Sequence, residues 1–189
     1  MSTIDLSRDA TDPRKRYAGV RMQQGRVLTD DDFNEAAVLD AEEMRRTRLD
    51  AIGAYGAGDD GFLLKDFAML ADLGIAAPGR PTFKLAAGTV YLGGLRVEMQ
   101  VDEWFHLQKD WLNFDPAVDW PAAPAAGQSR IDLAWLEVWQ QPVTAVEDAE
   151  LYEVALGGAD TSVRMRTMRR IQLTAGIGET DCAPAWAIA

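Results

Sequence analysis

The segment of this 189-residue chain that most resembles a cofactor-binding motif is Gly56–Gly61, whose sequence GAGDDG matches GxGxxG. In dinucleotide-binding folds this motif follows a strand and opens a helix. Here it follows a helical pattern and precedes strand-like segments. The position therefore favours a flexible or tightly turned connector over a cofactor site. No phosphate-binding loop of the Walker type, no GxSxG and no HExxH occurs in the sequence, and we expect no cofactor.

Histidine and cysteine are too scarce for most metal chemistry. The chain has one cysteine, Cys182, and one histidine, His106. One cysteine excludes an intrachain disulfide, and the pair cannot supply a His/Cys cluster for zinc or iron. His106 stands among bulky residues in EWFHLQ, with no Cys or Ser partner in view. We interpret it as a packed or surface histidine, not a catalytic base.

Paired carboxylates could hydrolyse glycosidic bonds, so four acidic clusters are candidates for catalysis. Each lies at the end of an expected element or in a turn, where Asp and Glu cap helices and satisfy loop backbones. Calcium binding is not favoured either, because the Asp-x-Asp-x-Asp-Gly spacing is missing. We therefore expect no catalytic and no metal-binding residues, and a protein that is not an enzyme. The clusters are Asp30–Asp32 with Glu35, Asp59–Asp60, Asp102–Glu103 and Glu147–Asp148.

Charge and hydropathy exclude further classes. Apolar residues make up 48% of the chain and charged residues 26%, as in ordinary globular domains. The net charge of -11 repels phosphate backbones and anionic bilayers, so nucleic acid is not an expected partner. The first residues lack a signal-like apolar core, and no segment approaches about 18 consecutive apolar residues. We expect synthesis in the cytosol and no membrane insertion.

The first 28 residues predict an extended N-terminal arm. They show no sustained hydrophobic period, although apolar anchors recur along them. The arm is basic, whereas Asp30, Asp31, Asp32 and Glu35 follow at once. Such an arm can dock on an acidic neighbour, including another copy of the chain, or stay solvated. Five basic residues gather between positions 14 and 26: Arg14, Lys15, Arg16, Arg21 and Arg26.

A long helix is expected from about Asp30 to Ile52. Thr29 with the three aspartates offers a capping-box-like start, and the acidic residues suit the positive end of the helix dipole. The apolar stripe could pack on the chain's own domain or on copies of the helix about a symmetry axis. It consists of Phe33, Ala37, Ala41, Met44 and Ala51, widened by Val38, Leu49 and Ile52.

The remainder predicts a β-rich domain. Two strand-like segments flank Gly93-Gly94, a pair suited to a two-residue hairpin turn. Further strands are expected over 131–140 and 163–173, the second alternating apolar residues with Arg, and a long loop with three prolines and several aromatics is expected over 104–128. We therefore predict an α+β fold, mostly antiparallel in its sheets. Its regions are an arm (1–28), a helix with a Gly-rich connector (29–61) and a β-rich domain (62–189).

Three segments together resemble a known family: YAGVRMQQGRVLTDDDFNE (17–35), LAAGTVYLGGLRVEM (85–99) and LEVWQQPVTAVEDAELYEVALGGADTSVRMRTMRRIQL (136–173). In this order they are similar to an uncharacterised-domain family encoded in extracellular contractile injection system and phage-tail-like gene clusters. The pattern formed by Gly25, Arg26, Leu28, Asn34 and Glu35 more distantly resembles the start of phage baseplate and tail-fibre proteins. The resemblance implies a structural place in a tail, baseplate or fibre. It also implies an oligomer, with a trimer favoured.

The resemblance also indicates where contacts form. Gly25 permits a sharp bend, Arg26 can reach a carboxylate, and Asn34-Glu35 in the first helical turn can hold an arm, of the same chain or of a neighbour. Relatives in the family are longer, so we expect a receptor-binding domain to be absent or supplied by another subunit. The expected partner-binding residues are Tyr17, Val20, Arg21, Met22, Gly25, Arg26, Val27, Asn34 and Glu35.

Two alternatives come from other classes. One is an adhesin-like module that binds a cell-surface glycan through a tryptophan-rich loop containing Trp104, Trp111 and Trp120. The other is a polysaccharide hydrolase that uses two of the carboxylates named above. Exposed tryptophans would favour the first, and a cleft holding two carboxylates roughly 5 to 9 Å apart would favour the second.

Overall fold

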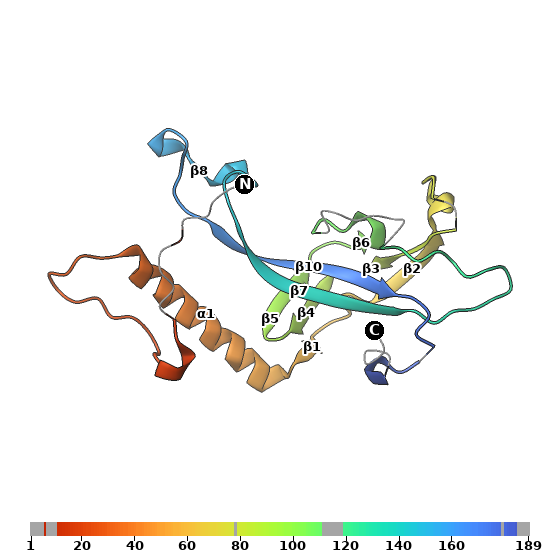
Figure 1. The fold of residues 1–189 in the computed structure, drawn as a ribbon, viewed down its shortest axis with the longest axis horizontal. Coiled ribbons are helices and arrows are strands. Elements are labelled where there is room, and N and C mark those ends of the chain that lie inside the picture. The colour runs from red at the N-terminus through yellow and green to blue at the C-terminus, as the bar shows by residue number, and fades with distance from the viewer. Residues whose placement is uncertain (1–5, 7–10, 78, 111–118, 179, 185–189) are drawn as a thin grey trace. The chain divides into compact units, whose positions relative to one another are not determined.

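The computed structural model describes residues 6, 11–77, 79–110, 119–178 and 180–184. They form an α+β fold that is mostly β, with one long helix, short 3-10 turns and mostly antiparallel sheets (Figure 1). The fold class predicted from the sequence is confirmed. The helix is α1 (Asp30–Ile52), and the strands are β1 (Tyr55–Ala57), β2 (Leu64–Met69), β3 (Pro81–Leu85), β4 (Gly88–Leu92), β5 (Leu95–Met99), β6 (Glu103–Trp104), β7 (Leu133–Val143), β8 (Tyr152–Glu153), β9 (Ala159–Asp160) and β10 (Arg164–Thr174).

Five short 3-10 turns join these elements: η1 (Pro13–Lys15), η2 (Leu70–Leu73), η3 (Phe105–Leu107), η4 (Ala149–Leu151) and η5 (Val154–Leu156). The strands are ordered β1-β4-β5, β2-β3-β6, β10-β7 and β8-β9. The chain divides into two compact units, and each draws on several stretches of sequence. Unit 1 comprises residues 1–56, 91–95 and 142–166, and unit 2 comprises residues 57–90, 96–141 and 167–189.

In unit 1, helix α1 begins and ends where the sequence predicts. The aspartates of its first turn lie at the positive end of the helix dipole, and Gly53 (φ 97°) follows its last residue. The predicted side-chain cap is wrong in detail. The Thr29 hydroxyl donates to the Asp32 carboxylate at 2.7 Å, so Thr29 caps no backbone N–H of the helix.

The tip of the β4–β5 hairpin also belongs to unit 1. Gly93 (φ 60°) and Gly94 (φ 78°) both have positive φ, which a two-residue turn of the mirror-image type requires. The hairpin predicted from this glycine pair is therefore confirmed. The amide of Gly93 donates to the Ala54 carbonyl at 2.8 Å, which ties the turn to the segment after α1.

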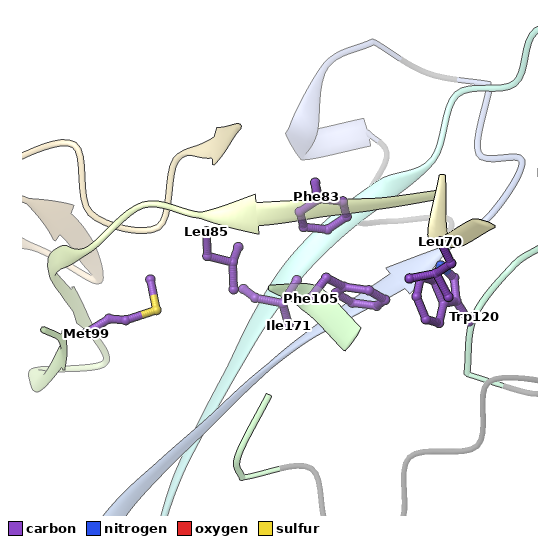
Figure 2. Packing of buried hydrophobic residues seen from close by; sticks show 7 residues of the cluster. All are labelled: Leu70, Phe83, Leu85, Met99, Phe105, Trp120 and Ile171. Atoms are coloured by element: carbon purple, nitrogen blue, oxygen red, sulfur yellow. The ribbon is translucent and has the colours of Figure 1, made fainter. Parts of the chain in front are cut away.

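In unit 2, the hydrophobic core gathers side chains from strands, turns and one loop. Its buried members are Leu70, Phe83, Leu85, Met99, Phe105, Trp120 and Ile171, which lie side by side in Figure 2. The Phe105 ring stacks on Phe83, with centroids 5.0 Å apart, and meets Trp120 edge-on at 5.5 Å. Strand β3 is central here, because it pairs antiparallel with both β2 and β6.

Strand β10 departs from the predicted alternation. Met165 is 61% exposed, whereas Met168 and Ile171, three residues apart, are both buried. A side chain from another part of the chain also bonds β10 at Ile171. The Gln108 amide accepts from the Ile171 N–H at 2.6 Å and donates to the Ile171 carbonyl at 3.0 Å, so this side chain bonds the strand as another strand would. On the polar side of the strand, Arg164 and Arg166 are exposed, whereas Arg170 is half-buried and pairs with Glu137. Arg169 pairs with Glu103 at 2.7 Å.

Candidate functional site: the arm and the outer face of helix α1

The arm is anchored locally at its basic end. Asp12 caps η1 by accepting from the Arg14 N–H at 3.0 Å and also pairs with the Arg14 guanidinium at 3.0 Å. These bonds lower the pKa of the Asp12 carboxyl below its ordinary value. Lys15 lies 5.8 Å from the centre of the Tyr17 ring. Arg14 and Lys15 therefore have neighbours within the arm itself.

Three other described arginines of the arm are different. Arg16, Arg21 and Arg26 are exposed, and within the described ranges of the chain no acidic side chain pairs with them. The arm turns back at Gln23, where the Arg26 N–H donates to the Gln23 carbonyl at 3.3 Å. Gly25 has φ 74° in this turn, as its predicted role in a sharp bend requires. The bend presents Arg26 to solvent.

Two hollows lie where the arm meets the helix. The first, of about 150 Å³, is lined by Val20, Arg21, Met22, Gln23, Arg26, Val27, Leu28 and Asp32. The second, of about 320 Å³, is lined by Leu28, Thr29, Asp30, Phe33 and Asn34. Five residues predicted to bind a partner thus line one hollow, and Asn34 lines the other. Tyr17, Gly25 and Glu35 line neither, although Tyr17 is exposed.

The predicted lock between the arm and the first helical turn does not form inside this chain. Within the described residues, no hydrogen bond joins the Asn34 or Glu35 side chain to the arm, and no carboxylate receives Arg26. The apolar anchors of the arm are also largely exposed, Val27 to 85%. The residues predicted to join the arm to the first helical turn therefore make no such contacts with one another in the described part of the chain.

Helix α1 has no buried residue among its 23 positions. The predicted apolar stripe is exposed except at Leu49: Phe33 is 66% and Met44 is 55% accessible, and Ala37, Ala41 and Ala51 are exposed as well. The half-covered residues follow a helical period on the other side, and they include Glu35, Leu39, Glu42, Arg45 and Leu49. The stripe therefore does not pack on the described part of its own chain.

A network of charged groups explains which face is covered. Glu42 accepts from the Arg45 guanidinium at 2.7 Å and from Arg46 at 2.8 Å, and Arg45 Nη1 donates to the Gly93 carbonyl at 3.0 Å. The hydrogen bonds from Arg45 and Arg46 lower the pKa of Glu42 to about 2. Helix α1 thus turns an ion pair toward the hairpin and its apolar stripe toward solvent, the reverse of the usual amphipathic arrangement.

The glycan-binding alternative needs exposed tryptophans, but Trp120 is buried and Trp104 is half-buried. Trp120 is 1% exposed, and its indole N–H donates to the Pro81 carbonyl while its ring packs on Phe105. Its ring therefore belongs to the core of unit 2. Trp104 is half-buried, with the Lys84 ammonium 5.0 Å from its ring centre. Trp111 lies outside the described residues.

His106 and the acidic pairs lie in structural contacts. His106 Nδ1 is 2.9 Å from the hydroxyl of Thr82, and its ring stacks on Trp120 at 5.8 Å. Burial lowers the pKa of His106, and Thr82 is fully buried, so its hydroxyl cannot meet a substrate. Within the described ranges, no three His, Cys, Asp or Glu side chains are placed to hold a metal ion.

Each acidic cluster has members with a nearby partner. Asp59 accepts from the N–H groups of Gly61 at 2.8 Å and Thr89 at 2.9 Å, and these bonds lower the pKa of its carboxyl. Asp102 pairs with Lys65 at 2.8 Å and also accepts from the backbone, which lowers its pKa. Glu147 accepts from the Thr144 N–H at 3.1 Å. The Gly-rich connector is therefore organised by Asp59.

Comparison with known proteins places the chain in a family. Residues 2–180 match the model of a family of unknown function, DUF6519, and the chain belongs to this family. No curated protein and no solved structure matches the chain. Among the described residues, no helix has both the length and the apolar character needed to cross a membrane.

Proposed function

We propose that this chain is a structural subunit of a phage-tail-like particle, such as a contractile injection system or a phage tail. It acts at the baseplate or fibre-attachment level, through contacts with other subunits and without catalysis. The observation that supports a contact function is the outer face of α1, where an apolar stripe from Phe33 to Ala51 is exposed along the helix. Long exposed apolar faces of this kind mark interaction surfaces.

The arm supports the same function. Its described residues bury little of their apolar surface, and fixing each backbone residue costs roughly 1–2 kcal/mol of conformational entropy. A docked arm therefore needs burial against another surface. The exposed apolar residues and Arg21 and Arg26 can supply that burial and the polar contacts against an acidic neighbour. The particle, its baseplate level and a trimeric state are proposed from the resemblance described above.

The particle itself provides the test. The chain, made in the cytoplasm, is expected in purified tail-like particles, including those released from cells, and deletion of residues 1–24 should remove it from them. A melting curve should show that the truncated chain still folds. A finer pair of variants is Arg26→Glu, expected to reduce incorporation, and Arg14→Glu as a control, because Arg14 pairs with Asp12 inside the arm. Normal incorporation of the truncated chain would exclude the arm as the attachment point.

The two alternatives differ in the residues they need. No observation on the described residues favours a tryptophan-based glycan site, since Trp120 is buried. Replacing His106 by Ala, or each carboxylate pair by amides, should leave particle assembly and target killing near normal where the fold survives. Loss of glycan cleavage in such a variant, with assembly intact, would favour the hydrolase instead.

A further inference from the structure

Helix α1 exposes most of its predicted apolar stripe, and the exposed apolar residues have a regular spacing. Phe33, Ala37, Met44 and Ala51 lie on the side opposite Glu42, at intervals of four and seven residues. Asp40 and Thr47 lie on the same side, so positions 33, 37, 40, 44, 47 and 51 are spaced alternately by four and three residues. Positions that alternate by four and three residues form the seam of a coiled coil. From 33 to 51 this seam is about 27 Å long, since a helix rises 1.5 Å per residue.

We propose that α1 docks on α1 of a second copy of this chain, parallel and in register, through this seam. The inference rests on the proposed contact function and names the partner. Alanines at 37 and 51 allow two helix backbones to approach closely, and Phe33 and Met44 supply the apolar bulk of the contact. The seam is short and contains Asp40, so association is weaker than in an all-apolar coiled coil.

The charged residues beside the seam favour a second copy of the chain as the partner, with the two helices parallel. Glu43 lies along one edge of the seam and Arg48 along the other, five residues later. In a parallel, in-register pair, residues with this five-residue offset face each other across the two helices. Glu43 has no hydrogen-bonding partner among the described residues, and the only bond recorded for the Arg48 guanidinium is to Met44 Sδ at 2.9 Å. An antiparallel pair would instead place Glu43 beside Glu43 of the second copy.

The arm adds a second complementary pair at the same end of the helix. Arg21 and Arg26 precede the acidic first turn, Asp30–Asp32, by a few residues, and their guanidiniums are exposed. Parallel copies bring the arm of one chain near the acidic helix start of the next. The basic arm then offsets the repulsion between adjacent aspartate clusters. In an antiparallel pair the aspartate clusters lie at opposite ends, and the arm has no such role.

The first test is sedimentation of the purified full chain at increasing concentration. The wild-type chain should associate, and Phe33→Asp should weaken its self-association by about tenfold or more, because an anchor of the seam is lost. Phe33 is exposed, so the variant should melt at the wild-type temperature. Asp40→Leu should tighten the association. A wild-type chain that stays monomeric at high concentration would overturn the proposal.

A charge exchange tests the pairing. Glu43→Arg and Arg48→Glu should each weaken association, and the double exchange should restore it. Asp50→Arg is the matched control, since it makes the same charge change as Glu43→Arg. The residue five positions after Asp50 is Tyr55, which lies beyond the end of the helix, so Asp50 has no partner of this kind on the second copy. Equal effects of Glu43→Arg and Asp50→Arg, or no recovery in the double exchange, would contradict the pairing.

Disulfide trapping tests the direction. With Cys182→Ser removing the exposed native thiol, Ala37→Cys and Ala51→Cys should each form a disulfide with its own copy. An antiparallel pair would instead form one only when the two variants are mixed, and that result would refute the proposed arrangement. A chain that is monomeric in solution yet enters particles through its arm would refute this docking and leave the proposed function standing.

Discussion

The turn of the β4–β5 hairpin offers a sharp test of how α1 is held. Gly93 and Gly94 both have positive φ, so a side chain at either position is strained by roughly 1–2 kcal/mol. The two sites differ in their surroundings. A Cβ on Gly93 would meet nothing within 4 Å, whereas a Cβ on Gly94 would lie 2.3 Å from the Arg45 carbonyl oxygen and 2.8 Å from Arg45 Cγ.

The magnitudes follow from these contacts. Gly93→Ala should lose about 1–2 kcal/mol of unfolding free energy, from conformational strain alone. Gly94→Ala adds a clash with helix backbone, which cannot move aside as a flexible side chain can, and overpacking of this kind costs roughly 1–3 kcal/mol more. Gly93→Asn should be close to neutral, because Asn tolerates the left-handed conformation and suits this turn.

Urea denaturation followed by circular dichroism measures all three variants against the wild-type chain. The expected order of stability is Gly93→Asn, then Gly93→Ala, then Gly94→Ala. Equal losses for the two alanine variants would falsify the close approach of α1 to the turn. A large loss for Gly93→Asn would show that the turn does not have the conformation described here.

Three further predictions concern single side chains. The pKa of His106 is lowered by burial from 6.5, so the stability that its neutral form contributes should be present above pH 6.5 and lost as the pH falls below it; melting temperatures of the wild-type chain and His106→Gln should differ in their slope over that window. The pKa of Glu42 is lowered from 4.5 to about 2, so Glu42→Gln should cost less than about 1 kcal/mol at pH 7, and the difference should vanish as the pH falls from 4.5 to 2 in urea titrations. Trp120→Ala should cost about 3–5 kcal/mol in unfolding free energy, because it leaves a cavity in the core, whereas Trp104→Ala, at a half-buried site, should cost clearly less; similar losses for the two would contradict the assignment of Trp120 to the core.

The sequence predicts an element correctly where the residues at its ends themselves determine the backbone conformation there. The aspartates after Thr29 and the glycine at 53 bracket α1, and the Gly93-Gly94 pair defines the hairpin. These residues act on their own stretch of backbone, so their effect is visible without the rest of the fold. The same is true of the bend at Gly25, which lies within the predicted contact region.

The sequence could not predict the tertiary contacts that each helix, strand or loop makes with distant residues. The period of α1 reveals an apolar stripe, but it cannot show that Glu42 and Arg45 face the hairpin instead. In β10, alternation fails at Met165 and Met168, and Gln108, more than sixty residues away, bonds the strand at Ile171. The tryptophan-rich loop predicts a surface position for Trp120 in the glycan-binding alternative, yet its indole fills the core. Each of these outcomes depends on a contact between distant parts of the chain.

The net charge of -11 opposes self-association, because acidic copies of the chain repel one another. At physiological salt this repulsion is screened beyond about 8 Å, whereas charges in direct contact are screened much less. What decides association is therefore the charge at the contact itself. There the described residues offer an apolar seam, one acidic edge facing one basic edge, and a basic arm beside an acidic helix start. An acidic chain can thus stay apart from unrelated acidic surfaces and still recognise its own copies.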